Sequence, residues 1–214
     1  MTSDQPPRSL SDLNPRQRYA VLVSASLVQR RHEVLSRDLQ RALDQAFSSA
    51  ELVELILQSL LFDGYPCTLE GLITLKSLNA SALPADESLE AYSPENLLLW
   101  DERGRALCER IYGANFNRLL QNVSDLSPTL REWMLLEGYG RVLARPALSI
   151  DLRELGIIAI LTVKGLPRQL HSHLRGALRV GVSAGQLEDA IHLCAEYTTE
   201  ERILSALAVL RNIN

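Results

Sequence analysis

The sequence predicts an all-α fold, and three observations support that prediction. Residues 13–75 align with residues 148–210 at a constant offset of 135 positions without a gap, and 13 of the 63 paired positions are identical. Helix-start signals and apolar residues at helical spacing recur at the same offset. Segments that alternate between apolar and polar residues, as strands do, are absent from the sequence. We therefore expect two degenerate repeats of antiparallel helix pairs.

The first repeat, residues 13–78, is expected to contain four helices. Pro15 suits the first turn of the first helix. Ser48 and Glu51 form a capping box, in which the serine side chain accepts from the amide three residues on and the glutamate reaches back. The helix after the box is apolar on nearly every side, so we expect it to lie between layers or subunits. The turn 63–66 separates it from the fourth helix. The expected helices are Pro15–Arg31, Glu33–Gln45, Leu52–Phe62 and Pro66–Leu78.

The second repeat, residues 148–214, shows the same devices. Its capping box, Ser183 with Gln186, lies 135 positions after the first. Gly165 and Gly181 suit C-terminal caps, and Pro167 suits a first turn. The expected helices are Leu152–Lys164, Pro167–Val180, Leu187–Tyr197 and Glu200–Asn212.

The remaining segments are expected to be an arm and a connection. Residues 1–12 are expected to be a flexible arm, and residues 79–147 a linker with a helical insert. Asn79–Glu95 is rich in Ser, Ala, Pro and acidic residues, as surface connections are. Two helices are expected in the insert, the second following Ser127-Pro128 and ending at Gly138-Tyr139-Gly140; they are Trp100–Tyr112 and Leu130–Glu137.

Composition argues against several classes of function. The net charge is −4 without a basic block, and aromatic residues make up only 5%, so nucleic acid is not an expected partner. No apolar run reaches the ~18 residues of a membrane span, and the polar N-terminus lacks a signal-peptide core. We therefore expect a cytoplasmic protein without membrane contact. Cys67, Cys108 and Cys194 are odd in number and widely spaced, which predicts free thiols.

His173 and Glu154 are the residues best suited to chemistry. His173 stands on the apolar stripe of its helix, and a buried histidine is a good general acid or base. Glu154 precedes an almost wholly apolar segment, where it could also belong to a capping box with Asp151. The interval of 19 residues places the two on consecutive packed helices, where the carboxylate can orient the imidazole. No metal site or cofactor is expected, because His171 and His173 at a spacing of two cannot share one ion easily.

The segments around these two residues resemble the carboxymuconolactone decarboxylase family, which shares its all-helical fold with alkylhydroperoxidase D. The resemblance is carried by Arg153-Glu154-Leu155, His173–Leu178, Gly181-Val182-Ser183 and Leu187–Ile191. It extends to Phe62-Asp63-Gly64-Tyr65-Pro66, Tyr139-Gly140-Arg141-Val142 and Arg145-Pro146. Together these segments cover most of residues 13–210.

The resemblance implies which branch of chemistry to expect. The peroxidase branch carries Glu, eleven residues, CxxC, three residues and His. Here Leu166 and Gln169 occupy the two cysteine positions, so CxxC-type peroxidase activity is not expected. The decarboxylase branch implies loss of CO₂ from a lactone acid, as in aromatic catabolism, with a lyase activity in which His173 supplies the proton and Glu154 orients it.

The resemblance also implies substrate-binding residues and an assembly. Arg145 and Arg175 are candidates for holding substrate carboxylates, and Tyr139 and Tyr65 for lining the site. Single-repeat members of the family form rings, so this chain is expected to form a trimer equivalent to six repeats. Two other functions remain open from the sequence: a peroxide-detoxifying protein using Cys67 or Cys194, and a non-catalytic helical assembly module.

Overall fold

The structure is a computed structural model that describes residues 12–78 and 91–213, and within these ranges it is all-α, without strands. Its N-terminal part contains α1 (Pro15–Gln29), α2 (His32–Gln45), α3 (Ser49–Leu57) and α4 (Leu60–Leu78). Its central part contains α5 (Pro94–Tyr112), the 3₁₀ turn Gly113–Asn115, α6 (Phe116–Leu126), α7 (Pro128–Trp133) and a π-helix at Met134–Leu143. Its C-terminal part contains α8 (Ile150–Lys164), α9 (Pro167–Arg179), α10 (Ala184–Leu193), the 3₁₀ turn Cys194–Glu196 and α11 (Glu200–Arg211).

The helix starts recur at the same 135-residue offset as the sequence repeat. α8, α9 and α10 begin 135 positions after α1, α2 and α3 respectively. Both predicted capping boxes form, Ser48 with Glu51 and Ser183 with Gln186. The division into two repeats remains a prediction. The predicted arm lies outside the described residues except for Asp12, as does the connection except for residues 91–95.

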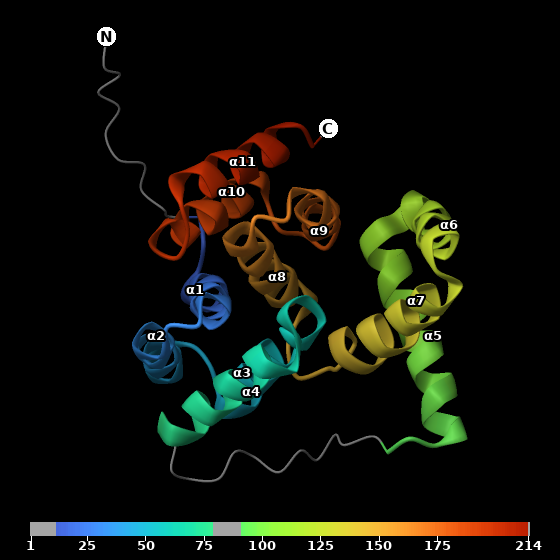
Figure 1. The fold of residues 1–214 in the computed structure, drawn as a ribbon, viewed down its shortest axis with the longest axis horizontal. Coiled ribbons are helices and arrows are strands. Elements are labelled where there is room, and N and C mark those ends of the chain that lie inside the picture. The colour runs from blue at the N-terminus through green and yellow to red at the C-terminus, as the bar shows by residue number, and fades with distance from the viewer. Residues whose placement is uncertain (1–11, 79–90, 214) are drawn as a thin grey trace.

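Helix α8 lies near the centre of the molecule (Figure 1), where it contacts α1, α9 and α10. Every residue from Leu152 to Val163 is buried, which accounts for a segment that is apolar on all sides. α1 contributes to both hydrophobic clusters: Val21 and Ala25 to the cluster around α8 to α11, and Ala20 and Val23 to the cluster around α2 to α4. Two core regions therefore share one helix.

The break expected near Gly64 is confirmed, although the helix before it is shorter than expected. Gly64 has φ 77°, a conformation that favours glycine, and it kinks α4 just before Pro66. α3 already ends at Leu57. The Ser59 hydroxyl donates to the Ile56 carbonyl at 2.7 Å, and this local bond competes with continuation of the helix.

The insert differs most from the prediction. α5 starts at Pro94, six residues early, because Ser93 accepts a hydrogen bond from the Asn96 amide and caps it. α6 was not predicted. The glycines of Gly138-Tyr139-Gly140 led us to expect a helix end there. The segment instead lies inside the π-helix. The reason is packing: a Cβ on Gly140 would lie 2.0 Å from the Trp100 carbonyl oxygen of α5.

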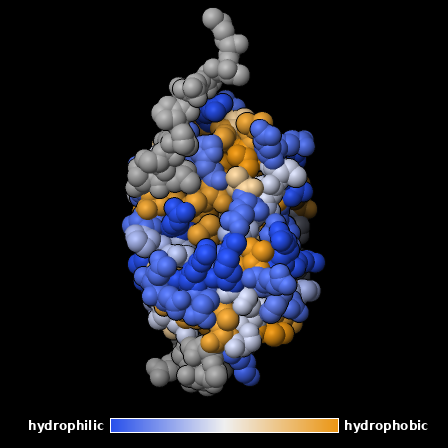
Figure 2. Space-filling view, turned by 90° about the vertical axis from the view of Figure 1, so that its left-hand side faces the viewer, coloured by the Kyte–Doolittle hydropathy of each residue, from blue (hydrophilic) through white to orange (hydrophobic). Residues whose placement is uncertain are grey.

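The surface is unevenly apolar. Figure 2 shows the face on the α2 side, where hydrophilic side chains predominate and apolar ones form small scattered groups. Several large apolar residues are exposed, namely Tyr65, Leu69 and Ile73 on α4, Leu98 on α5, Leu126 at the end of α6, and Leu130 and Trp133 on α7. No helix within the described residues is both long and apolar enough to cross a bilayer.

Candidate active site at the α8–α9 contact

His173 and Glu154 meet at the contact between α8 and α9. His173 Nδ1 lies 3.0 Å from Glu154 Oε2, and the two residues are 7% and 0% exposed. A buried carboxylate is costly unless it is paired, and the imidazole supplies a partner. Glu154 does not belong to a capping box, because α8 begins at Ile150 and Asp151 already lies inside it. This hydrogen bond orients the ring, so that Nε2 is the nitrogen left to serve a ligand.

Two neighbours hold this dyad, the pair Glu154 and His173, in place. A Cβ on Gly176 of α9 would lie 2.5 Å from Ile111 Cγ2 of α5 and 3.7 Å from Glu154 Oε2. The absence of a side chain at Gly176 therefore allows α9 to approach both α5 and the carboxylate. The Phe62 ring contacts the imidazole edge-on, with the ring centres 5.6 Å apart. Residues from α4 and α8 thus contact the histidine of α9.

His173 lines a cavity of about 500 Å³. The walls are mainly apolar, with polar groups at a few positions, as is usual for sites that bind small molecules. The apolar lining comes from Leu61, Phe62, Leu119, Val123, Leu130, Trp133, Met134, Gly138 and Leu143, and the polar lining from Tyr112, Glu137, Tyr139, Arg168, Gln169, Ser172 and His173. The dyad therefore stands at a hollow and not within solid packing.

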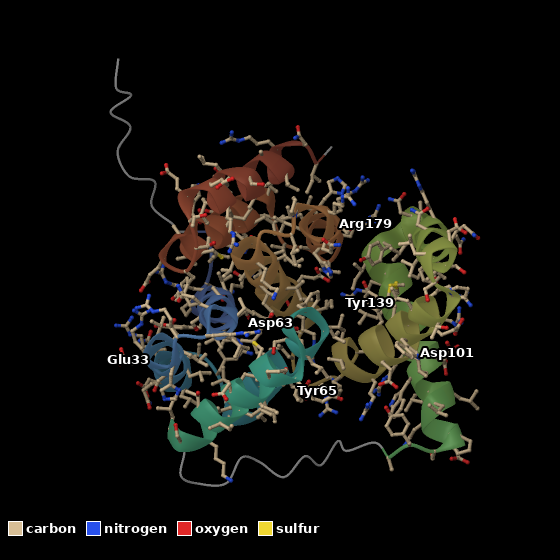
Figure 3. The ribbon with its side chains drawn as sticks, viewed as in Figure 1. Glu33, Asp63, Tyr65, Asp101, Tyr139 and Arg179 are labelled. Carbon is tan, nitrogen blue, oxygen red and sulfur yellow. The ribbon has the colours of Figure 1, made fainter. Side chains whose placement is uncertain are left out.

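The π-helix supplies one wall of this cavity. The Ala144 amide donates to the Tyr139 carbonyl at 2.8 Å, a five-residue step that widens the helix. Tyr139 is buried and its hydroxyl donates to that of Tyr112 at 2.9 Å. Burial raises the pKa of both phenols above their ordinary value, so both are neutral hydrogen-bonding groups at neutral pH. Figure 3 labels Tyr139 in the space between α9 and the helices of the insert, α5 to the π-helix.

Of the four residues predicted to bind substrate, only Tyr139 lines this cavity. Tyr65 is on α4 and 70% exposed. Arg145 Nε lies 2.8 Å from Glu54 Oε1, and the other oxygen of Glu54 is 2.8 Å from Arg153 Nη2. This buried cluster joins α3 to α8 and occupies Arg145 away from the dyad.

Arg175 lines a neighbouring cavity and not the dyad cavity itself. Arg175 follows Ser172 by three residues on α9, so the two lie on the same side of the helix. Ser172 lines both cavities. Tyr112, Arg168 and Ser172 were missed by the sequence analysis. The sequence does hold a signal for Arg168 and Ser172, because two polar residues four apart on the helix of His173 lie on one side of that helix. Tyr112 has none, because only the packing of the insert brings it to the site.

None of the three cysteines lines the dyad cavity. Cys67, Cys108 and Cys194 are all free, as predicted, and all three are buried. Desolvation raises the pKa of Cys67 to about 11 and those of Cys108 and Cys194 to about 12. At neutral pH these thiols are protonated and hence weak nucleophiles. Gln169, at one of the two family cysteine positions, lines the dyad cavity, so an amide stands where a thiol would act.

Comparison with known proteins agrees with this geometry. Residues 117–212 match the model of the carboxymuconolactone decarboxylase family, a range that contains all but the first residue of α6, the whole of α7 to α11 and both dyad residues. The chain is also similar to Peroxisomal protein 2 of Schizosaccharomyces pombe, with 28% identity over 191 residues, or 88% of each chain. The chain is thus similar to the carboxymuconolactone decarboxylase family over its C-terminal part, and this part is all-helical.

Proposed function

We propose that the protein is an enzyme that moves a proton on a small carboxylated substrate, with His173 as the general acid and base and Glu154 as its positioning residue. The observation that carries this proposal is the 3.0 Å hydrogen bond between two buried side chains at the wall of a cavity of about 500 Å³. A general acid needs a fixed direction of proton transfer and access to the reacting atom. Nε2 of His173 meets both needs.

Decarboxylation of a lactone acid is the reaction that the family name suggests. In that step the bond from carbon to the carboxylate breaks, CO₂ leaves, and the electron pair delocalises into the conjugated lactone. The imidazolium form of His173, whose Nδ1–H is bonded to Glu154, then donates its Nε2 proton to the resulting carbanionic carbon and regains a proton from water. The phenol of Tyr112, which accepts the Tyr139 proton, keeps its own O–H to donate to the oxygen on which charge accumulates.

Replacement of His173 by Gln tests the proposal. Gln keeps a hydrogen bond to Glu154 but cannot transfer a proton at neutral pH, so turnover should fall by about 10²–10⁴-fold. The assay is CO₂ release from carboxymuconolactone, with helicity followed by circular dichroism. The control is His192→Gln, on the half-exposed surface of α10, which should retain activity. Undiminished turnover in H173Q, or no CO₂ release by the unmodified protein, would contradict the assignment.

The peroxidase alternative has weaker support. It would need a thiolate next to the histidine, whereas the three thiols have raised pKa values and line no wall of the dyad cavity. Hydroperoxide consumption that survives in a variant with all three cysteines replaced by serine would rule out a thiol mechanism.

The cellular location is a separate matter. The name of the yeast relative points to the peroxisome, whereas the sequence led us to expect the cytoplasm. Fluorescence microscopy of the tagged full-length protein against a peroxisomal matrix marker decides between the two locations.

A further inference from the structure

A second cavity of about 450 Å³ adjoins the dyad cavity. The two cavities share three lining residues, Tyr112, Leu119 and Ser172. Its remaining lining is polar and basic, unlike the apolar walls around His173. A ligand that fills the dyad cavity can therefore extend past Ser172 into a space of different chemistry.

Two helices face each other across this second cavity. On α9, Arg168, Ser172, Arg175 and Arg179 follow one another at steps of four, three and four residues, so they lie on one side of the helix. Arg168 lines the dyad cavity, and Arg175 and Arg179 line the second one. The face of α9 that bears the arginines thus runs along both cavities.

The opposite wall is polar as well. On α6, Arg118 and Asn122 lie one turn apart and both line the second cavity, together with Asn115, the residue that precedes the helix. The Asn115 side chain makes no capping bond, and the first turn of α6 has no acidic residue.

The positive charge of the cavity is uncompensated within the described residues. The guanidinium groups of Arg118, Arg175 and Arg179 form no ion pair there. Arg179 is nevertheless held in position, since its Nη1 donates to the backbone carbonyls of Tyr112 and Ile111 at the end of α5. Figure 3 labels Arg179 between α9 and the α5 and α6 helices. Three arginines around one cavity without a carboxylate partner are suited to an anionic ligand.

We infer that the second cavity binds the anionic group of the ligand, a carboxylate or a phosphate, while the apolar part of the same ligand occupies the dyad cavity. This inference rests on the proposed function for the placement of the apolar part. It differs from the sequence prediction in the residues involved: Arg175 remains in this role, Arg118 and Arg179 join it, and Arg145 does not take part.

Binding of three matched probes tests the inference by titration calorimetry: phenylbutyrate, phenylbutyl phosphate and the neutral phenylbutanol. The unmodified protein should bind at least one anion about tenfold or more tightly than the alcohol, and this preference should shrink as salt is added. Preference for the phosphate over the carboxylate, or the reverse, identifies the anion that the arginines accept.

The variant to compare is the double substitution R118M/R175M, which keeps side-chain length and removes two charges. It should lose about tenfold or more in affinity for the preferred anion and keep its affinity for phenylbutanol. Arg179 is left in place because it caps α5. The control is R41M, which removes an exposed charge from α2. Equal losses in R41M and R118M/R175M, an unchanged anion preference in R118M/R175M, or no binding of any probe would overturn the inference.

The same titration on H173Q separates this inference from the proposed function. H173Q should keep the anion preference even though turnover is lost, because His173 does not line the second cavity. Loss of turnover without loss of anion preference supports both statements. An anion preference that persists while H173Q remains fully active contradicts only the proposed chemistry.

Discussion

At the scale of single residues, the central feature is a carboxylate that has no exposure to water and one imidazole partner. Glu154 is 0% exposed, and its Oε1 has no hydrogen-bond partner among the described residues. Such a group is expensive to bury for stability alone, so its position is better explained by what it does to His173. The ring is held from one side by the carboxylate and from another by Phe62.

Replacement of Glu154 by Gln should therefore lower kcat by about 10-fold to 10²-fold while KM changes little, because the ring loses its charged partner and its fixed orientation but the cavity is unchanged. Steady-state kinetics on the lactone acid measures both constants. Glu154→Asp, which keeps the charge, should recover part of the lost kcat. The matched control is Glu137→Gln, since Glu137 lines the same cavity but is paired with Arg141. A fall in KM alone, or equal effects in E154Q and E137Q, would argue against a positioning role.

At the scale of elements, the close contact between α5 and the π-helix determines the shape of the cavity. Gly104 of α5 and Gly140 of the π-helix pack so closely that a Cβ on Gly104 would lie 2.3 Å from the Leu135 carbonyl oxygen. Tyr139 is next to Gly140, so the packing of this pair also places the phenol at the site. π-helices are rare and often occur at functional sites.

Gly140→Ala should destabilise the protein by about 1–3 kcal/mol, because its Cβ would meet the Trp100 carbonyl oxygen at 2.0 Å and the backbones would have to separate. Urea unfolding followed by circular dichroism gives the free energy of unfolding. Gly138→Ala is the control from the same π-helix, since the nearest atom to its Cβ is 4.0 Å away. If both variants were equally stable, the glycine contact would not be what holds the π-helix to α5.

Helix position was the best-predicted feature at this scale. The second-repeat helices fall close to their expected ranges because proline, glycine and capping-box residues act within a few residues of themselves. The insert was predicted poorly for the opposite reason. The π-helix and the role of Gly140 depend on the backbone of Trp100, forty residues earlier, which no local pattern describes.

At the scale of the whole molecule, several buried thiols and phenols have a raised pKa. Burial raises the pKa of Cys67, Cys108 and Cys194, and also those of Tyr112 and Tyr139. In the unfolded chain these groups lose their protons at lower pH than in the folded protein. Their contribution to stability is therefore complete below the unfolded pKa and is lost as pH rises toward the folded pKa.

The free energy of unfolding should accordingly fall as pH rises above about 8.5, where unfolded cysteines begin to ionise. Urea midpoints measured at intervals across that range test this expectation. In Cys194→Ala one titrating group is removed, so the fall should be less steep by up to about 1.4 kcal/mol per pH unit. An identical slope in C194A and the unmodified protein would show that this buried thiol does not contribute.

Self-association is a second property of the whole molecule. Tyr65, Leu69 and Ile73 lie at four-residue intervals on α4 and are all exposed, which makes an apolar row suited to a second copy of the chain. We expect a trimer in light scattering and dissociation of it in L69E/I73E. The control is Leu204→Glu, at another exposed leucine, on α11. A monomer at micromolar concentration, or a trimer that persists in L69E/I73E, would contradict the prediction.

The sequence by itself determined the helical class and the boundaries of most helices, because helix periodicity and capping act over short distances. It also predicted the pairing of His173 with Glu154, because an interval of 19 residues places them on consecutive helices. Only the tertiary structure decided which other residues reach that pair. Tyr112 comes to the dyad cavity from an insert that packs through backbone contact at Gly140, and Arg145 is paired with Glu54 instead. These outcomes depend on contacts between distant segments, for which the competing partners of each side chain are known only once the chain has folded.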